Sequence, residues 1–251
     1  MVVKELIEAR WKLIAGAVVI TLVSAVLAGF YDVLKQSLSG SSSLQQLPQT
    51  LHNQVQQLLG SFGVYAWSQW FSKTGPELLA VLAAILGASL IASEVSKGTI
   101  FFLLSKPISR ERVLLVKYAV SALILLGIMV LSSAALLVTA AILGYPQNVY
   151  GVAVSTLLLW LGMLFVLGLA LLFSVLFKDV LRSLVGALVI PLVLSIPGYL
   201  HGWGAWNLTG YWADFPTYLG QSFPIKALII CLIAALVPLV AAIPLFRKQA
   251  Y

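Results

Sequence analysis

The sequence has few charged residues and a single cysteine. Only 9% of its 251 residues are Asp, Glu, Lys or Arg, whereas 61% are hydrophobic, and the mean hydropathy is +1.03. A soluble domain carries about 25% charged residues, so this chain cannot cover a water-facing surface and belongs in a lipid bilayer. Because Cys231 is the only cysteine, an intrachain disulfide is excluded.

Sequence motifs for catalysis, metal binding and ATP binding are also missing. There is no H-E-x-x-H zinc motif and no G-x-x-x-x-G-K-[ST] phosphate loop. A charge at the centre of a membrane span costs about 2.5–3.5 kcal/mol, and Glu77, Glu94 and Asp179 all fall at the ends of apolar runs. This pattern disfavours an intramembrane enzyme and an ion-coupled carrier. We expect no cofactor in this chain, and we expect ATP and magnesium only in a separate partner subunit.

Long apolar runs are what the sequence does have. A transmembrane helix needs about 20 apolar residues to cross about 30 Å of hydrocarbon. Six runs approach or exceed that length, at residues 13–30, 76–93, 113–143, 149–177, 183–199 and 224–246. The sequence therefore predicts an all-α polytopic membrane protein of about six transmembrane helices, in which residues 1–251 form a single transmembrane domain.

The first twelve residues mix charged and apolar side chains. Leu6, Ile7, Arg10 and Trp11 fall near one helical face, which predicts an amphipathic N-terminal helix over 1–12 at the membrane interface. A signal peptide is the alternative interpretation. The apolar run that follows is long for a signal sequence and no A-x-A-like cleavage site follows it, so an uncleaved anchor is favoured.

Two of the segments that connect the apolar runs are long and polar or aromatic. Residues 31–75 predict an extracytoplasmic loop, with a short amphipathic helix at 48–60 and an aromatic cluster at 62–71 that favours the headgroup level. The segment 201–223 is rich in Trp and Tyr and is interpreted as an aromatic belt, with a substrate-binding patch as the alternative. Either aromatic segment could also be re-entrant.

The basic residues define an orientation. Of the 15 Lys and Arg residues, only Lys35, Lys73 and Lys226 fall on the side opposite the termini. Because positive residues mark the cytoplasmic side, both termini are predicted to be cytoplasmic in a multi-pass protein of the cell membrane. The net charge of +7 thus reflects topology and predicts contact with membrane lipid, not nucleic acid. The residues interpreted as membrane anchors are Arg10, Lys12, Arg112, Lys117, Lys178 and Arg182.

The predicted cytoplasmic segment 94–112 has the most specific pattern. Gly98 permits a sharp turn, Thr99 is a candidate helix cap, and 100–104 is a short apolar stretch that Pro107 ends. An apolar helix flanked by charges suits docking into a groove on a partner, and equally suits a helix resting on lipid. Glu94 either neutralises Lys97 or Arg110 at the headgroup level or takes part in coupling directly.

The same segment carries the pattern E-x-x-x-G-T-[IL]-x-x-L-L-S-x-P-[IV]-S-R-x-x-[IVL]-x-x-x-K. It resembles the permease subunits of type-two ABC exporters, whose order of an interfacial helix and six spans is similar to that of the whole chain. The resemblance implies that 94–112 is a coupling helix that contacts an ABC ATPase subunit. It also implies that the pore forms with a second permease copy or a paralogue. Coupling contacts are expected from Glu94, Gly98, Thr99, Phe101, Leu103, Leu104, Ser105, Pro107 and Arg110.

A second function remains open at this point. The same helices and the same cytoplasmic segment would suit a non-transporting membrane scaffold or sensor that anchors an ATPase or an assembly complex. ATP-dependent movement of a cargo would distinguish the exporter from the scaffold.

Overall fold

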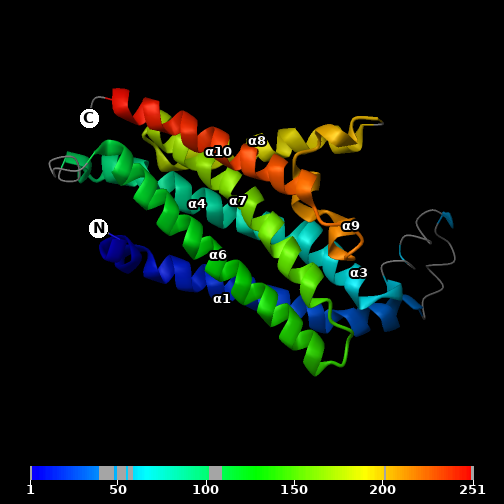
Figure 1. Cartoon of the computed structure of the whole chain (residues 1–251). Coiled ribbons are helices and arrows are strands. Elements are labelled where there is room, and N and C mark those ends of the chain that lie inside the picture. The colour runs from blue at the N-terminus through cyan, green and yellow to red at the C-terminus, as the bar shows by residue number, and fades with distance from the viewer. Residues whose placement is uncertain are drawn as a thin grey trace.

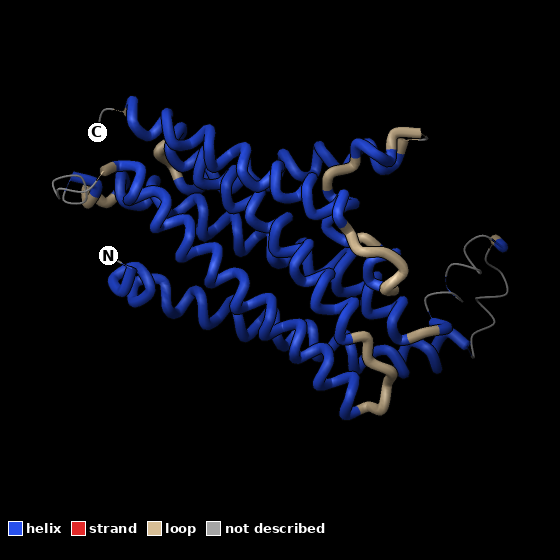
Figure 2. The backbone as a smooth tube through the Cα atoms, viewed as in Figure 1, coloured by secondary structure: helices blue, strands red, loops and turns tan. Residues whose placement is uncertain are grey.

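The structure is a computed structural model that describes residues 2–39, 48–49, 55, 59–101, 109–200 and 202–249. All regular secondary structure among these described residues is helical, and none of them forms a strand (Figure 2). Six of its helices are long and apolar enough to cross a membrane, at Leu13–Ser37, Phe62–Ser96, Arg110–Ile142, Val149–Phe177, Val180–Gly198 and Ile225–Lys248. The predicted all-α polytopic fold is confirmed.

The long helices are joined by short turns and by a few single-turn helices. The elements are α1 (Val2–Ser39), α3 (Phe62–Ala66), the π-helix η2 (Trp67–Thr74), α4 (Gly75–Ser96), α6 (Arg110–Ile142), α7 (Val149–Phe177), α8 (Val180–Ser195), the 3₁₀ helices η3 (Ile196–Tyr199), η4 (Gly204–Trp206) and η5 (Thr209–Ala213), α9 (Phe215–Tyr218) and α10 (Ile225–Lys248).

Helix α7 lies at the centre of the bundle. It packs against α4, α6, α8 and α10, whereas α1 lies at one edge and packs mainly along α6 (Figure 1). Small residues permit the closest approaches, as is usual between membrane helices. A Cβ at Gly87 of α4 would lie 2.6 Å from the Cβ of Ala170 in α7, and one at Gly168 would lie 2.8 Å from Pro238 of α10.

Buried hydroxyl groups link the helices to one another. Ser24 of α1 donates to the carbonyl of Ser132 in α6 (2.8 Å), and Ser133 of α6 shares a hydrogen bond with Thr156 of α7 (2.8 Å). Because lipid offers no alternative partner to these groups, such bonds fix the register of α1, α6 and α7.

Ser174 of α7 reaches into the backbone of α4. Its hydroxyl donates to the carbonyl of Ala88 (2.9 Å) and accepts from the amide of Ala92 (2.7 Å). These two groups are the acceptor and donor of one i→i−4 helical pair. A neighbouring side chain at such a pair marks a point at which a helix can bend.

The N-terminal segment and the first span form one helix. Helix α1 begins at Val2, so the segment predicted to lie at the interface continues directly into the span. The helix also continues past Phe30, the predicted end of the span, to Ser39. Tyr31 stabilises this extension, because it is buried and its ring packs edge-on against Phe62 (5.5 Å between centroids) and Tyr145 (5.3 Å).

The aromatic cluster at 62–71 is part of a helix, not of a surface loop. Phe62–Thr74 runs as α3 and η2 directly into α4, so this segment extends the second apolar helix, Phe62–Ser96. Trp70 and Phe71 are fully buried, so these two aromatic side chains pack into the bundle and do not lie at its surface. Of the predicted amphipathic helix at 48–60, only positions 48, 49, 55, 59 and 60 are described.

The segment 201–223 divides into an exposed and a buried part. Trp203 and Trp206 are exposed, as an aromatic belt would be, whereas Trp212 and Tyr218 are buried. A Cβ at Gly162 of α7 would lie 2.6 Å from the Trp212 ring, so the missing side chain makes room for the indole. Burial raises the pKa of Tyr218 to about 12, so its phenol stays neutral.

Candidate functional site

The segment between α4 and α6 begins on a buried ion pair. The Nζ of Lys117 lies 3.2 Å from Oε1 of Glu94, and the side chains are 3% and 16% exposed. The hydroxyl of Thr99 donates to the other carboxylate oxygen of Glu94. Lys117, interpreted from sequence as a membrane anchor, is therefore inside the bundle, because its position on α6 faces the end of α4. Glu94 thus has a partner other than Lys97, which is exposed.

The chain turns sharply after α4. Gly98 has a φ of +69°, a conformation that other residues rarely adopt. The next two apolar side chains then diverge: Ile100 is buried, whereas Phe101 is 61% exposed. Four residues of the predicted coupling set, Leu103, Leu104, Ser105 and Pro107, lie outside the described residues.

The start of α6 is tied to the end of α10. Ser109 caps α6 by accepting from the amide of Arg112 (3.3 Å). Arg110 donates to the carbonyl of Gln249 (2.7 Å), and Glu111 forms an ion pair with Arg247. A force applied to the N-terminus of α6 would therefore reach α10 as well as α4.

The remaining predicted anchors lie at or near the ends of helices. Arg112 and Arg182 are exposed, and Lys178 is half-buried with a left-handed φ of 55° where α7 ends. Arg10 and Lys12 lie in the first turns of α1, and their side chains are not described. The start of α1, the end of α10, the end of α4 and the start of α6 all lie at one end of the bundle (Figure 1).

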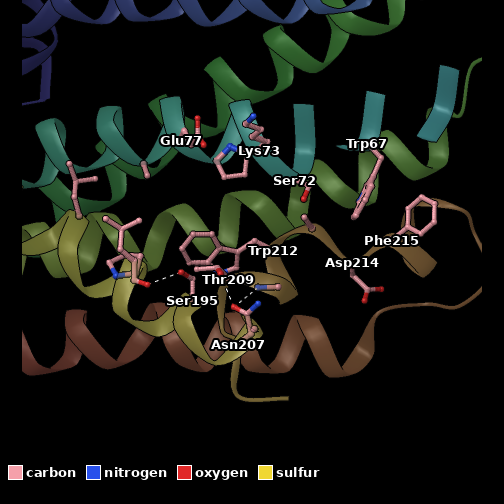
Figure 3. A pocket seen from close by; sticks show the side chains of 18 of the residues that line it. Trp67, Ser72, Lys73, Glu77, Ser195, Asn207, Thr209, Trp212, Asp214 and Phe215 are labelled. Atoms are coloured by element: carbon pink, nitrogen blue, oxygen red, sulfur yellow. Dashed lines mark hydrogen bonds between the residues drawn. The ribbon is translucent and has the colours of Figure 1, made fainter. Parts of the chain in front are cut away.

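A cavity of about 950 Å³ opens near the other end of the bundle, between η2 and α4, α8 and the segment around η5. Figure 3 shows Lys73 and Glu77 on the wall formed by η2 and α4, with Trp212 between that wall and Asn207. The sequence left a substrate-binding patch in 201–223 as an alternative interpretation, but it did not indicate that this segment lies beside η2 and α4. Lys73 and Glu77 flank the predicted helix start, but only the fold brings the segment around Asn207 to the same place.

Some polar groups of the residues that line the cavity have hydrogen-bond partners, and others do not. Asn207 Oδ1 accepts from the Thr209 hydroxyl (2.8 Å), and Asp214 accepts from the amide of Thr217 (3.1 Å). The indole nitrogens of Trp67 and Trp212 are buried and have no hydrogen-bond partner among the described residues. The cavity thus combines charged and apolar lining residues, and two of its lining tryptophans carry buried indole nitrogens without a partner among the described residues.

The described residues contain no cluster of three or more His, Cys, Asp or Glu that could hold a metal ion. Residues 3–213 match the family described as ABC-2 family transporter protein. No curated protein and no solved structure gave a match to the chain. The family match covers most of the chain and agrees with the six apolar helices. The chain therefore belongs to the ABC-2 family of transporter permeases, and it is a membrane permease subunit and not itself the ATPase.

Proposed function

We propose that this permease forms the substrate pathway of an ATP-driven exporter and couples to a separate ABC ATPase through the segment 94–112. ATP and magnesium bind in that partner, since the sequence has no phosphate loop. A second permease copy or a paralogue completes the pathway. Both termini and the coupling segment face the cytoplasm.

The observation that carries this proposal is the contrast between an exposed apolar side chain and the buried ion pair beside it. Phe101 is 61% exposed, only seven residues after Glu94. An exposed aromatic side chain on a braced segment is the kind of anchor that a partner's groove binds. The Glu94–Lys117 pair supports coupling, because it ties this segment to both α4 and α6.

Contacts at this end of the bundle support a route for the motion. A push on the segment acts on α4 through Glu94, on α6 through Lys117, and on α10 through Arg110. The Ser174 contact with the α4 backbone gives that helix a point at which to bend. We propose that ATP-driven motion of the partner tilts α4 and α6 and so switches access to the pathway.

The test is substitution of the exposed side chain. The variant Phe101→Asp places a charge where an apolar contact is proposed, and the matched control Trp206→Asp changes a side chain that is 74% exposed at the opposite end. We expect Phe101→Asp to lose co-purification with the ATPase and stimulation of its ATP hydrolysis, while Trp206→Asp retains both. Equal association and stimulation for the two variants would contradict the docking site. Association without ATP-driven cargo movement in proteoliposomes would indicate a scaffold instead.

A further inference from the structure

We propose that the cavity between η2 and α4, α8 and η5 binds the head group of a zwitterionic phospholipid that carries a primary ammonium and a phosphate. This site lies far from the coupling segment, and its occupancy does not depend on the exporter proposal. Three features of the cavity support this assignment: its two charges, its apolar wall, and two lining tryptophans whose buried indole nitrogens have no partner among the described residues.

Lys73 and Glu77 present opposite charges to the same cavity. Both side chains are exposed and both line it (Figure 3). Their four-residue spacing would suit an ion pair on a regular helix, but neither residue forms an ion pair with any described residue. The π-helix η2 ends and α4 begins between the two residues, so the backbone that separates them is not one regular α-helix. A ligand with a phosphate for Lys73 and an ammonium for Glu77 would satisfy both charges.

The cavity wall beside these charges is apolar on both α4 and α8 and continues onto the outside of the bundle. Val81 of α4 and Leu192 of α8 line the cavity and are themselves 44% and 68% exposed. In a membrane protein such a surface faces lipid chains. A head group held by Lys73 and Glu77 would therefore leave its acyl chains beside α4 and α8, which favours a lipid over a water-soluble phosphate ester.

Two of the residues that line the cavity are tryptophans with buried indole nitrogens. The indole nitrogens of Trp67 and Trp212 have no acceptor among the described residues, and a buried donor without a partner is unfavourable. Each nitrogen is covered in this conformation, so a ring would have to rotate before its N–H could reach a phosphate oxygen. Tryptophan also favours the headgroup level of a bilayer, which agrees with a head-group site here.

The experiment is a lipid-binding titration of the purified full chain in detergent, followed by native mass spectrometry. The probes are dioctanoyl phosphatidylethanolamine, dioctanoyl phosphatidylglycerol, which lacks the ammonium, and glycerophosphoethanolamine, which lacks the chains. We expect saturable binding of the ethanolamine lipid that exceeds binding of both other probes.

The variants assign the contacts. Lys73→Gln should weaken binding of both lipids about tenfold, the effect of one charge-assisted hydrogen bond. Glu77→Gln should weaken only the ethanolamine lipid, and so remove the preference for it. Lys35→Gln is the matched control, because Lys35 is an exposed lysine of α1 that does not line the cavity.

Three results would overturn the proposal. They are no saturable binding of the ethanolamine lipid to the unaltered chain, equal affinities for Lys73→Gln and Lys35→Gln, and equally tight binding of the chain-free head group. Because these variants leave the segment 94–112 unchanged, ATPase association measured on the same samples separates failure of this site from failure of the proposed coupling.

Discussion

At the scale of single residues, the buried pair of Lys117 and Glu94 is the most sensitive feature of the coupling end. Removing one partner leaves the other charge buried, which costs about 3–5 kcal/mol in comparable pairs. We expect Glu94→Gln to lower the free energy of unfolding by an amount towards the lower end of that range, because Glu94 is 16% exposed. The double variant Glu94→Gln/Lys117→Met should recover most of the loss, because it removes both charges.

Thermal unfolding of the purified chain in detergent measures both variants. Lys97→Met is the control, because Lys97 is an exposed lysine at the same end of α4 and its loss should change stability little. A double variant that is less stable than Glu94→Gln would show that the two charges do not compensate one another.

The sequence pointed to Glu94 but not to its partner. Lys97 and Arg110 lie closer to Glu94 along the chain, whereas Lys117 is 23 positions away. In the sequence, Lys117 resembles the other basic residues near the ends of spans. Only the packing of α4 beside α6 shows that Lys117 faces inward. An ion pair between two helices depends on how each helix is rotated about its own axis. Because these apolar helices are only weakly amphipathic, the sequence alone does not define that rotation.

At the scale of helices, the contact between α4 and α7 depends on Gly87. A Cβ there would lie 2.6 Å from the backbone oxygen of Leu167 and 2.6 Å from the Cβ of Ala170, so the two helices would have to separate. We expect Gly87→Ala to destabilise the bundle by about 1–3 kcal/mol, as overpacking does.

Gly127 of α6 supplies the matched control for that substitution. No atom lies within 4 Å of a Cβ at this position, so Gly127→Ala should be neutral or stabilising by up to about 1 kcal/mol from helix propensity. Both melting temperatures are measured in the same detergent. A melting temperature for Gly87→Ala equal to that of Gly127→Ala would contradict the close contact.

The transmembrane helices were largely predictable, because the length of each apolar run indicates the length of the helix that it forms. Residues 149–177 agree with α7 at both ends, where Asn148 caps the helix and Lys178 ends it. The chain between the first two spans was not predictable. Its helical extension to Ser39 and the inward packing of Trp70 and Phe71 depend on contacts with distant helices. The cavity formed beside this region was missed for the same reason.

At the scale of the whole molecule, the distribution of basic residues predicts a single orientation. Cysteines introduced at Lys97 and at Lys35 should report opposite sides, and both positions are exposed. The native Cys231 is fully buried, so it should give little background. A membrane-impermeant maleimide added to intact cells should label Lys35→Cys and not Lys97→Cys. The reverse pattern would place the termini outside and contradict the orientation.

The coupling proposed above requires that the exposed turn after α4 contacts a separate ATPase. The most direct measurement is site-specific crosslinking in native membranes, with a photoreactive amino acid at position 101 and, in a second variant, at position 206. Phe101 and Trp206 are both exposed, and the end of α4 that precedes Phe101 lies at the opposite end of the bundle from the segment between α8 and α9 that holds Trp206 (Figure 1). We expect a crosslinked product containing an ATP-hydrolysing subunit from position 101 and none from position 206. Crosslinking of that subunit from position 206, or its absence from position 101, would contradict it.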